Sequence, residues 1–484
     1  MILAKASEQS EMLDVEALIA SVLQLDPEAV TDELEYQSVV EWDSLQHVVL
    51  MVALEKASGI RINGELRVQL SSVKAIREFV QSGVPGRCAP KAVRVGSEPK
   101  EGLQAVPAAP PTIHRGLEGV HFDRTSIARI DGERSALEYR GYAIRDLVEH
   151  SSFEETTYLL VMGELPGAAA LAAFRRELEE ARAVPASVLS IVGSLASAHP
   201  MEALRTGVSA LGALDPERAD HSKEASLRKG VRLVAQIPLL IAAHQAARER
   251  RPLPLVPPGI SHASYLLHLV RGEAPSALDE RLIDTDLIVH ADHGSNASAF
   301  TARVAVGCRA GMHAAITAAI SVFAGTIHGG AAEAVTQVLD VVGTPERARA
   351  YVASQFEQGL PVMGFGHRVY RGEDPRVGPL RDAAREASSR KGDMRGFEII
   401  TALVEAMKPY ARHGIEANVD LYVGLLYRML GLSDELAVPM FVAGRIAGWV
   451  AQAREQESNN VLIRPLLHYV GAASRAHPGP GGLP

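Results

Sequence analysis

Histidine, aspartate, arginine and glycine gather in five short segments of the second half of the chain: 287–304, 362–376, 417–431, 441–449 and 459–471. They contain two glycine-flanked histidines and a single aspartate in an apolar stretch: His293, His367 and Asp420. A neutral imidazole can donate a hydrogen bond to an oxygen that gains negative charge, while a carboxylate removes a proton from a neighbouring carbon. These residue types therefore indicate general acid–base chemistry.

Three arginines in the same segments stand beside glycine or proline, and two of them have mostly apolar neighbours: Arg376, Arg445 and Arg464. An isolated guanidinium on an apolar background suits bidentate binding of a small carboxylate. For any single arginine an ordinary ion pair explains the residue equally well. Three of them together with the histidines and the aspartate favour an anionic substrate.

Other kinds of site are less well supported by these motifs. His290, Asp292 and His293 could form a ligand cluster, but no HExxH sequence or cysteine pair accompanies them, so we expect no metal. No GxxxxGK[ST] phosphate loop occurs. The GFGHRV stretch does not lie between a strand and a helix as a dinucleotide fingerprint would.

The composition describes the framework that must hold these residues. The chain has 484 residues, 47% of them apolar but only 5% aromatic, which favours helices over strands. The net charge of −9 argues against a nucleic-acid partner. The N-terminus has no apolar signal region, and we expect a cytoplasmic protein with no membrane partner.

A stretch rich in proline, glycine and alanine, residues 83–111, reads as a flexible linker. It separates a small helical unit, about 8–82, from a long unit, about 112–484. The long unit begins with a hairpin signal around Asp131-Gly132 and continues as helical segments with short breaks. We therefore predict a mostly α fold.

The segment EWDSLQHVVLMVALEKASGIRI (41–62) resembles acyl carrier proteins, and the match extends over the whole small unit. The resemblance implies that Ser44 carries 4′-phosphopantetheine, attached by a phosphopantetheinyl transferase. A helix N-terminus favours a phosphodiester at this position. The alternative is that Asp43-Ser44 is only a helix cap. Gln46 and His47 replace the acidic residues that often follow the serine in that family.

The long unit resembles the citrate synthase family over about 370 residues, in the order of that family's motifs. The motifs are ADH at 291–293, GFGH at 364–367, DPR at 374–376, NVD at 418–420, AGR at 443–445 and RP at 464–465. The resemblance implies a mostly helical homodimer with the active site in a cleft between two domains. We expect a large domain, 112–295 and 403–484, and a small domain, 296–402.

The resemblance also implies roles for single residues. His293 acts on the thioester carbonyl oxygen, Asp420 takes a proton from the thioester methyl, and His367 protonates the oxo oxygen of a 2-oxo acid. His328, in IHGG, is expected to be structural or to contact the site residues without touching the substrate. His262, in SHA, is expected to hydrogen-bond the oxo acid.

The arginines receive binding roles from the same resemblance. Arg376 and Arg445 bind the carboxylates, and Arg464 reaches the site of the neighbouring subunit. Arg371 lies near the phosphates of coenzyme A, whose adenine runs along the backbone of Met363 and Gly364.

Two positions depart from the family pattern: Gly294 stands where glutamate is frequent, and Ala332 replaces an amide. Both lie on the thioester side, so they bear on the acyl donor. We expect condensation of acetyl-CoA with oxaloacetate and water to citrate and CoA. The alternatives are 2-methylcitrate synthesis from propionyl-CoA, use of an acyl group carried on Ser44, or a docking module fused to an inactive relative.

Overall fold

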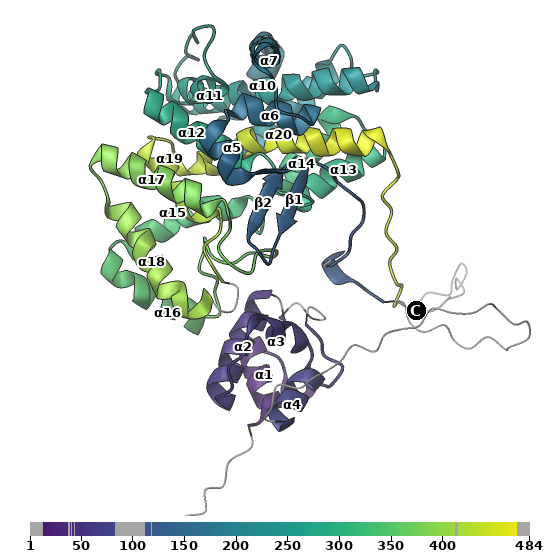
Figure 1. Ribbon diagram of the computed structural model, residues 1–484, viewed down its shortest axis with the longest axis vertical. Helices are drawn as coiled ribbons and strands as arrows, with labels where there is room; N and C mark the ends of the chain where they lie inside the picture. Colours follow the sequence, from purple (N-terminus) through teal and green to yellow (C-terminus); the bar gives the residue numbers. More distant parts are fainter. Residues whose placement is uncertain are drawn as a thin grey trace, which may run out of the picture.

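A computed structural model describes residues 13–36, 39, 41–42, 44–82, 112–117, 119–411 and 415–471. Its described elements are mostly helices, as predicted, and they form a small N-terminal bundle and a larger C-terminal assembly (Figure 1). The predicted linker lies outside the described residues, as does Asp43.

The N-terminal bundle has its own apolar core, which includes Ile19, Leu50, Leu54 and Ile76. Its helices are α1 (Val15–Leu23), α2 (Ser44–Ser58), α3 (Gly64–Gln69) and α4 (Val73–Ser82), with a 3-10 turn at Pro27–Ala29. The helical unit expected before the linker is therefore present. Ser44 is the first residue of α2, and only its backbone is described.

The predicted hairpin opens the larger assembly. Strands β1 (Ala128–Asp131) and β2 (Ala136–Tyr139) pair antiparallel, with Ile130 opposite Leu137, and the short β3 (Tyr142–Ala143) extends the sheet. The hairpin points away from the layer formed by α5, α6 and α20 (Figure 1).

The helices that follow the hairpin fall into two packing groups. The first is α5 (Ile144–His150), α6 (Phe153–Met162), α7 (Ala168–Glu180), α8 (Ala186–Ser194), α9 (Pro200–Leu214), α10 (Lys223–Glu249), α11 (His262–Arg271), α12 (Ala277–His290), α13 (Ala297–Gly307), α14 (Met312–Phe323) and α20 (Ala437–Ser458). The second is α15 (Gly330–Val342), α16 (Ala348–Glu357), α17 (Val377–Lys391), α18 (Arg395–Ala411) and α19 (Asp420–Met429).

The predicted division into a large and a small domain stays a prediction, but the packing suggests different boundaries. Helices α13 and α14 pack on α20 and α9, whereas α19 packs on α15 and α17. We therefore propose that the small domain begins near residue 330 and ends near residue 430.

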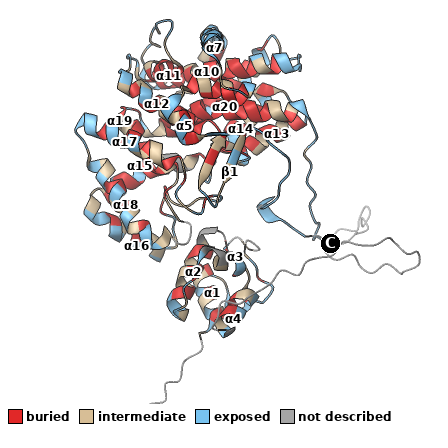
Figure 2. Cartoon of the chain, viewed as in Figure 1, coloured by how far each residue is buried: buried red, intermediate tan, exposed pale blue. Residues whose placement is uncertain are grey.

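Helix α20 is the centre of the larger assembly. The segment Asp434–Ser458 is long and apolar enough to cross a membrane, but its apolar window is entirely buried among other helices (Figure 2). It is therefore explained as a core helix, since α6, α10, α12 and α13 all pack against it.

Two glycines one turn apart allow α20 to approach the end of α12. A Cβ on Gly448 would lie 2.1 Å from the carbonyl oxygen of Ala291, and one on Gly444 would lie 2.8 Å from that of Leu287. The Gly448 amide instead donates to the Ala291 carbonyl at 2.9 Å. This contact places the residues after α12 directly against Arg445.

Replacing Gly448 by alanine should force α20 away from α12. Overpacking of this kind costs about 1–3 kcal/mol, so we expect a lower midpoint of thermal unfolding. Gly193→Ala in α8 is the matched control, because its new Cβ would meet only Ala247 Cβ at 3.9 Å. The control should be neutral or slightly stabilising, since alanine favours helix over glycine. Equal unfolding midpoints for the two variants would contradict this account.

Candidate active site

The turn that carries His293 is fixed from two sides. The buried hydroxyl of Tyr139, on β2, donates to the Asp292 carbonyl at 2.9 Å and accepts from the Asp292 amide at 3.1 Å. The Asp292 carboxylate accepts from the Gly294 amide at 2.7 Å and from Gln452 Nε2, on α20, at 3.2 Å. The sheet and the central helix thus hold the turn in one conformation.

The segment that carries His367 is bonded to the segment just before Asp420. Phe365 and Ala417 form an antiparallel bridge, the Gly366 amide donates to Glu416, and the Asn418 amide donates to Gly364. Gly364 has a φ of +86°, which favours glycine at this position. These backbone bonds bring two predicted site residues, far apart in sequence, to one place.

The two histidine rings lie together. Their centroids are 5.1 Å apart, and His293 Nε2 is 3.0 Å from the hydroxyl of Tyr370. His367 Nδ1 accepts from the amides of Val369 and Tyr370 at 2.9 and 3.1 Å, so in the neutral ring Nε2 carries the proton. His367 keeps partial exposure, so this N–H is available to a ligand.

Burial and positive neighbours keep both rings neutral at pH 7. Burial, followed by the charge of Arg376, lowers the pKa of His367 to about 4. The same two causes hold the pKa of His293 well below its usual value. The pair is therefore suited to hydrogen bonding with an anion rather than to carrying charge itself.

Two buried arginines lie beside the histidines and differ in their partners. Arg376 donates from Nε and Nη2 to the carboxylate of Asp374, at 2.9 and 2.6 Å. Arg445 donates from Nε to the His290 carbonyl at 2.6 Å, and among the described residues no carboxylate lies within ion-pair distance of it. Burial, then the charge of Arg376, lowers the pKa of Arg445 to about 10. A bound carboxylate would relieve this repulsion.

Asp420 is the first residue of α19, and its amide donates to the Asn418 side chain at 3.0 Å. Burial raises the pKa of Asp420 to about 7, with Arg376 acting in the opposite direction. A carboxyl group with such a pKa can accept a proton at neutral pH and release it again. Some of its surface remains accessible, so a substrate can reach it.

The structure does not bring His262 into this cluster. It lies on α11 between Phe153 and Tyr265, with ring centroids 5.1 and 6.3 Å away, and its amide donates to Glu154. Burial, then Arg182, lowers the pKa of His262 to about 3. His262 is buried in the helical core, and neither of its ring nitrogens has a hydrogen-bond partner among the described residues. Its hydrogen bond to an oxo acid stays a prediction.

Arg464 also lies apart from the cluster. It is exposed in the extended segment that follows α20 and runs away from the sheet (Figure 1). Arg371 is exposed at the edge of the site, and its amide donates to the Gly132 carbonyl at 3.0 Å. Met363 and Gly364 lie in the segment that leads to His367.

Three contributors were not singled out from the sequence. Tyr139 and Tyr370 hold the histidine segments, and Asp374 neutralises Arg376. The triplet Asp374-Pro375-Arg376 was the available signal, because aspartate two residues before arginine can form such a pair.

His328 contacts Ser298 and lies within the electrostatic reach of Arg445. Its Nε2 is 2.9 Å from the Ser298 hydroxyl, which also accepts from Trp449 Nε1 at 3.2 Å. Burial, then Arg445, lowers the pKa of His328 to about 4. It is therefore another neutral, half-buried histidine in the field of Arg445.

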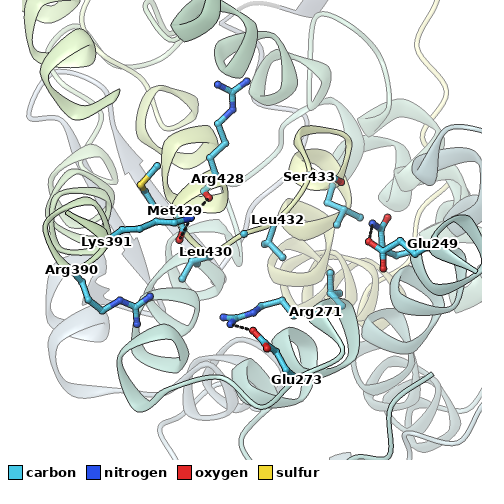
Figure 3. Close-up of a pocket in the computed structure, with 14 residues that line it drawn as sticks. Glu249, Arg271, Glu273, Arg390, Lys391, Arg428, Met429, Leu430, Leu432 and Ser433 are labelled. Carbon is cyan, nitrogen blue, oxygen red and sulfur yellow. Dashed lines mark hydrogen bonds and ion pairs between the residues drawn. The ribbon is translucent and has the colours of Figure 1, made fainter. Parts of the chain in front are cut away.

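A cavity of about 660 Å³ lies elsewhere, where the C-terminal ends of α10, α11, α17 and α19 converge (Figure 3). Its cations already have partners: Arg271 pairs with Glu273 and Asp279, and Arg428 pairs with Asp340 and Asp434. Lys391 Nζ lies 3.4 Å from two carbonyl oxygens of α19. Positive side chains at helix C-termini balance the helix dipoles, which explains this cluster structurally.

Comparison with known protein families identifies the family of this chain. The family described as citrate synthase, C-terminal domain, matches residues 116–466. The chain belongs to the citrate synthase family.

Curated relatives carry two different names. A citrate synthase of Deinococcus radiodurans is 38% identical over 362 residues, covering 74% of this chain and 96% of that protein. A 2-methylcitrate synthase of Mycobacterium tuberculosis is 37% identical over 372 residues, covering 76% and 93%. The family is therefore known, and the choice of acyl donor is not decided by identity.

A solved citrate synthase, from Thermoplasma acidophilum, has the same fold. It was solved in a ternary complex with carboxymethyl coenzyme A and oxaloacetate, and it matches with a TM-score of 0.73 at 28% identity. The match covers 76% of this chain and 98% of that one. The N-terminal bundle lies before the family match, which begins at residue 116.

The raised pKa of Asp420 predicts the pH dependence of this family member. A base must be deprotonated to act, so kcat/KM for condensation should rise about tenfold per pH unit up to about pH 7 and level off above it. The measurement is kcat/KM between pH 5 and 9 at constant ionic strength. An acidic limb near pH 4, the range of an unperturbed carboxyl group, would contradict the assigned role.

Proposed function

We propose that the protein condenses acetyl-CoA with oxaloacetate and water to give citrate and CoA. The observation that carries this proposal is the pair His293 and His367, whose ring centroids lie 5.1 Å apart. Two buried arginines, Arg376 and Arg445, act electrostatically on both His293 and Asp420. The ternary complex of the Thermoplasma acidophilum relative, with carboxymethyl coenzyme A and oxaloacetate, supports the same two substrate classes.

Asp420 would take a proton from the thioester methyl, which breaks a carbon–hydrogen bond and leaves an enolate. A methyl group next to a thioester is a very weak carbon acid, so the enolate oxygen needs a hydrogen-bond donor. His293 is the predicted donor. His328 is not available for this role, because the Ser298 hydroxyl donates to Asn296 and therefore accepts the single N–H of the neutral His328 ring at Nε2.

The enolate carbon then attacks the oxo carbon of oxaloacetate, and His367 supplies a proton to the oxygen as the new carbon–carbon bond forms. The Nε2–H of the neutral ring suits this role. Water cleaves the resulting thioester, which releases citrate and CoA. Acid–base groups of this kind contribute about 10²–10⁴-fold each.

The carboxylates of oxaloacetate would bind Arg376 and Arg445, which orients the oxo carbon. We propose that Arg464 completes this cage from the partner of a homodimer. Residues 461–470 favour this arrangement, because they are extended and expose Leu466, Leu467, Tyr469 and Val470. Apolar side chains along an extended arm are typical of a segment that packs on another subunit.

The near alternative is 2-methylcitrate synthesis from propionyl-CoA. The two thioesters differ by one methylene, which a pocket discriminates by only about 1–3 kcal/mol. Curated relatives with both names have similar identities to this chain, so identity does not choose between the two thioesters. We keep acetyl-CoA as the proposed substrate and propionyl-CoA as its competitor.

We further propose that the N-terminal bundle is a carrier whose Ser44 holds an acyl-phosphopantetheine. One contact with the catalytic part favours this: Gln46 Nε2, on the first turn of α2, donates to the Gly359 carbonyl at 3.3 Å. Gly359 precedes the segment of Met363, Gly364 and His367. The start of α2 is thus near the part of the chain assigned to coenzyme A.

Thiol release from acetyl-CoA in the presence of oxaloacetate tests the enzymatic proposal. Wild-type protein should release free thiol only when oxaloacetate is present, and propionyl-CoA should be compared at the same concentrations. Asp420→Asn should lose at least 100-fold in kcat, because the base is removed while the shape is kept. Full turnover by Asp420→Asn, or no thiol release by the wild type with either thioester, would contradict the proposal.

Intact mass after co-expression with a phosphopantetheinyl transferase tests the carrier proposal. We expect the mass of one phosphopantetheine arm on the wild type and none on Ser44→Ala, because that variant lacks the acceptor hydroxyl. An unchanged wild-type mass, or an arm on Ser44→Ala, would exclude Ser44 as the carrier residue. Condensation from free acetyl-CoA should be the same in both proteins.

A further inference from the structure

The β1–β2 hairpin touches both segments that carry the site histidines. Its tip packs so closely on the second segment that a Cβ on Gly132 would lie 2.3 Å from the Val369 carbonyl oxygen. The Arg371 amide donates to the Gly132 carbonyl at 3.0 Å, and Tyr139 bonds the turn before His293. The hairpin is therefore a wall of the site.

Ile130 is the hairpin residue that points at the His293 turn. A Cβ on Gly294 would lie 2.8 Å from Ile130 Cδ1, and Gly294 has a φ of +55°. The end of the isoleucine side chain thus fills the space that a side chain at position 294 would need. The absence of glutamate at this position is explained by an apolar group beside His293.

Ile130 also lines a cavity of about 410 Å³ between the hairpin and the second histidine segment. The residues that line this cavity include Val369 as a second apolar residue, Arg371, and Arg129, whose guanidinium group pairs with Glu138. Asp131 and Glu133 also line it. A cavity lined by both apolar and arginine residues suits a short acyl chain on a phosphate-bearing thioester.

The side chain of Ile130 has little freedom to move aside. It is β-branched, which restricts its first torsion angle, and its strand partner Leu137 is fully buried in the core. A longer acyl group that entered from the cavity would meet this side chain before it reached the turn of His293.

We propose that Ile130 is a specificity-determining residue that limits the length of the acyl group. The inference rests on the proposed condensation, and it assigns the acyl end of the thioester to the space between Ile130, Gly294 and Val369. Removing carbon atoms from Ile130 should admit one or two more methylenes. The arginines proposed to bind the carboxylates of the oxo acid, Arg376 and Arg445, are not changed in these variants. Binding of the oxo acid should therefore not change.

The test is kcat/KM of wild type, Ile130→Val and Ile130→Ala with acetyl-, propionyl- and butyryl-CoA at saturating oxaloacetate. The propionyl-to-acetyl ratio should rise at least tenfold in Ile130→Ala, and the butyryl-to-acetyl ratio should rise more, because one methylene in a fitted pocket is worth about 10–200-fold. Ile130→Val should lie between. The KM of oxaloacetate should stay within about twofold of wild type in all three proteins.

Leu137→Ala is the matched control, because it loosens the same hairpin without enlarging the space beside Gly294. It should lower kcat/KM for all three thioesters equally and leave their ratios unchanged. Ratios in the Ile130 variants that change no more than in Leu137→Ala would overturn the inference. If wild type condensed none of the thioesters, the proposed function would fail instead, which is a distinguishable outcome.

Discussion

The close approach of α20 to the end of α12 is the constraint on which the site depends. With no side chain at Gly448, its amide can bond the Ala291 carbonyl, and the Arg445 side chain then reaches the carbonyl of His290. The same helix sends Gln452 to Asp292. One helix–helix contact therefore places a guanidinium group, a buried carboxylate and the His293 turn together. The second histidine segment and α19 complete the site from the other packing group.

Burial gives these groups their chemistry. Imidazoles that are removed from water and placed near Arg376 stay neutral, so they can donate hydrogen bonds to a developing oxyanion. Burial also raises the pKa of Asp420 to about 7, so its carboxylate becomes a strong enough base to take up a proton near neutral pH. Asp374 compensates one of the two arginines and leaves Arg445 for an anion. The site is preorganised for negative charge that arrives with the substrate or develops during reaction.

The motifs in the sequence predicted which residues form the site better than they predicted the tertiary contacts that hold those residues. The helical class, the hairpin at Asp131-Gly132 and the proximity of His293 to His367 all agree with the structure. A histidine on an apolar helix does not reveal what its ring faces, so the sequence alone could not show that the His262 ring packs between Phe153 and Tyr265. Tyr139 was not found because its role depends on a contact between residues 153 positions apart in sequence. Such contacts follow from tertiary packing and leave no local pattern.

Formation of a carbon–carbon bond is the central claim, and carbon-13 NMR of a single reaction tests it most directly. Acetyl-CoA labelled at the methyl carbon would be incubated with the protein and oxaloacetate labelled at the oxo carbon. The account predicts a one-bond coupling between the two labels in the product, because the methyl carbon becomes bonded to the former oxo carbon. Labelled acetate without that coupling would show that the protein only hydrolyses the thioester, and it would contradict the account.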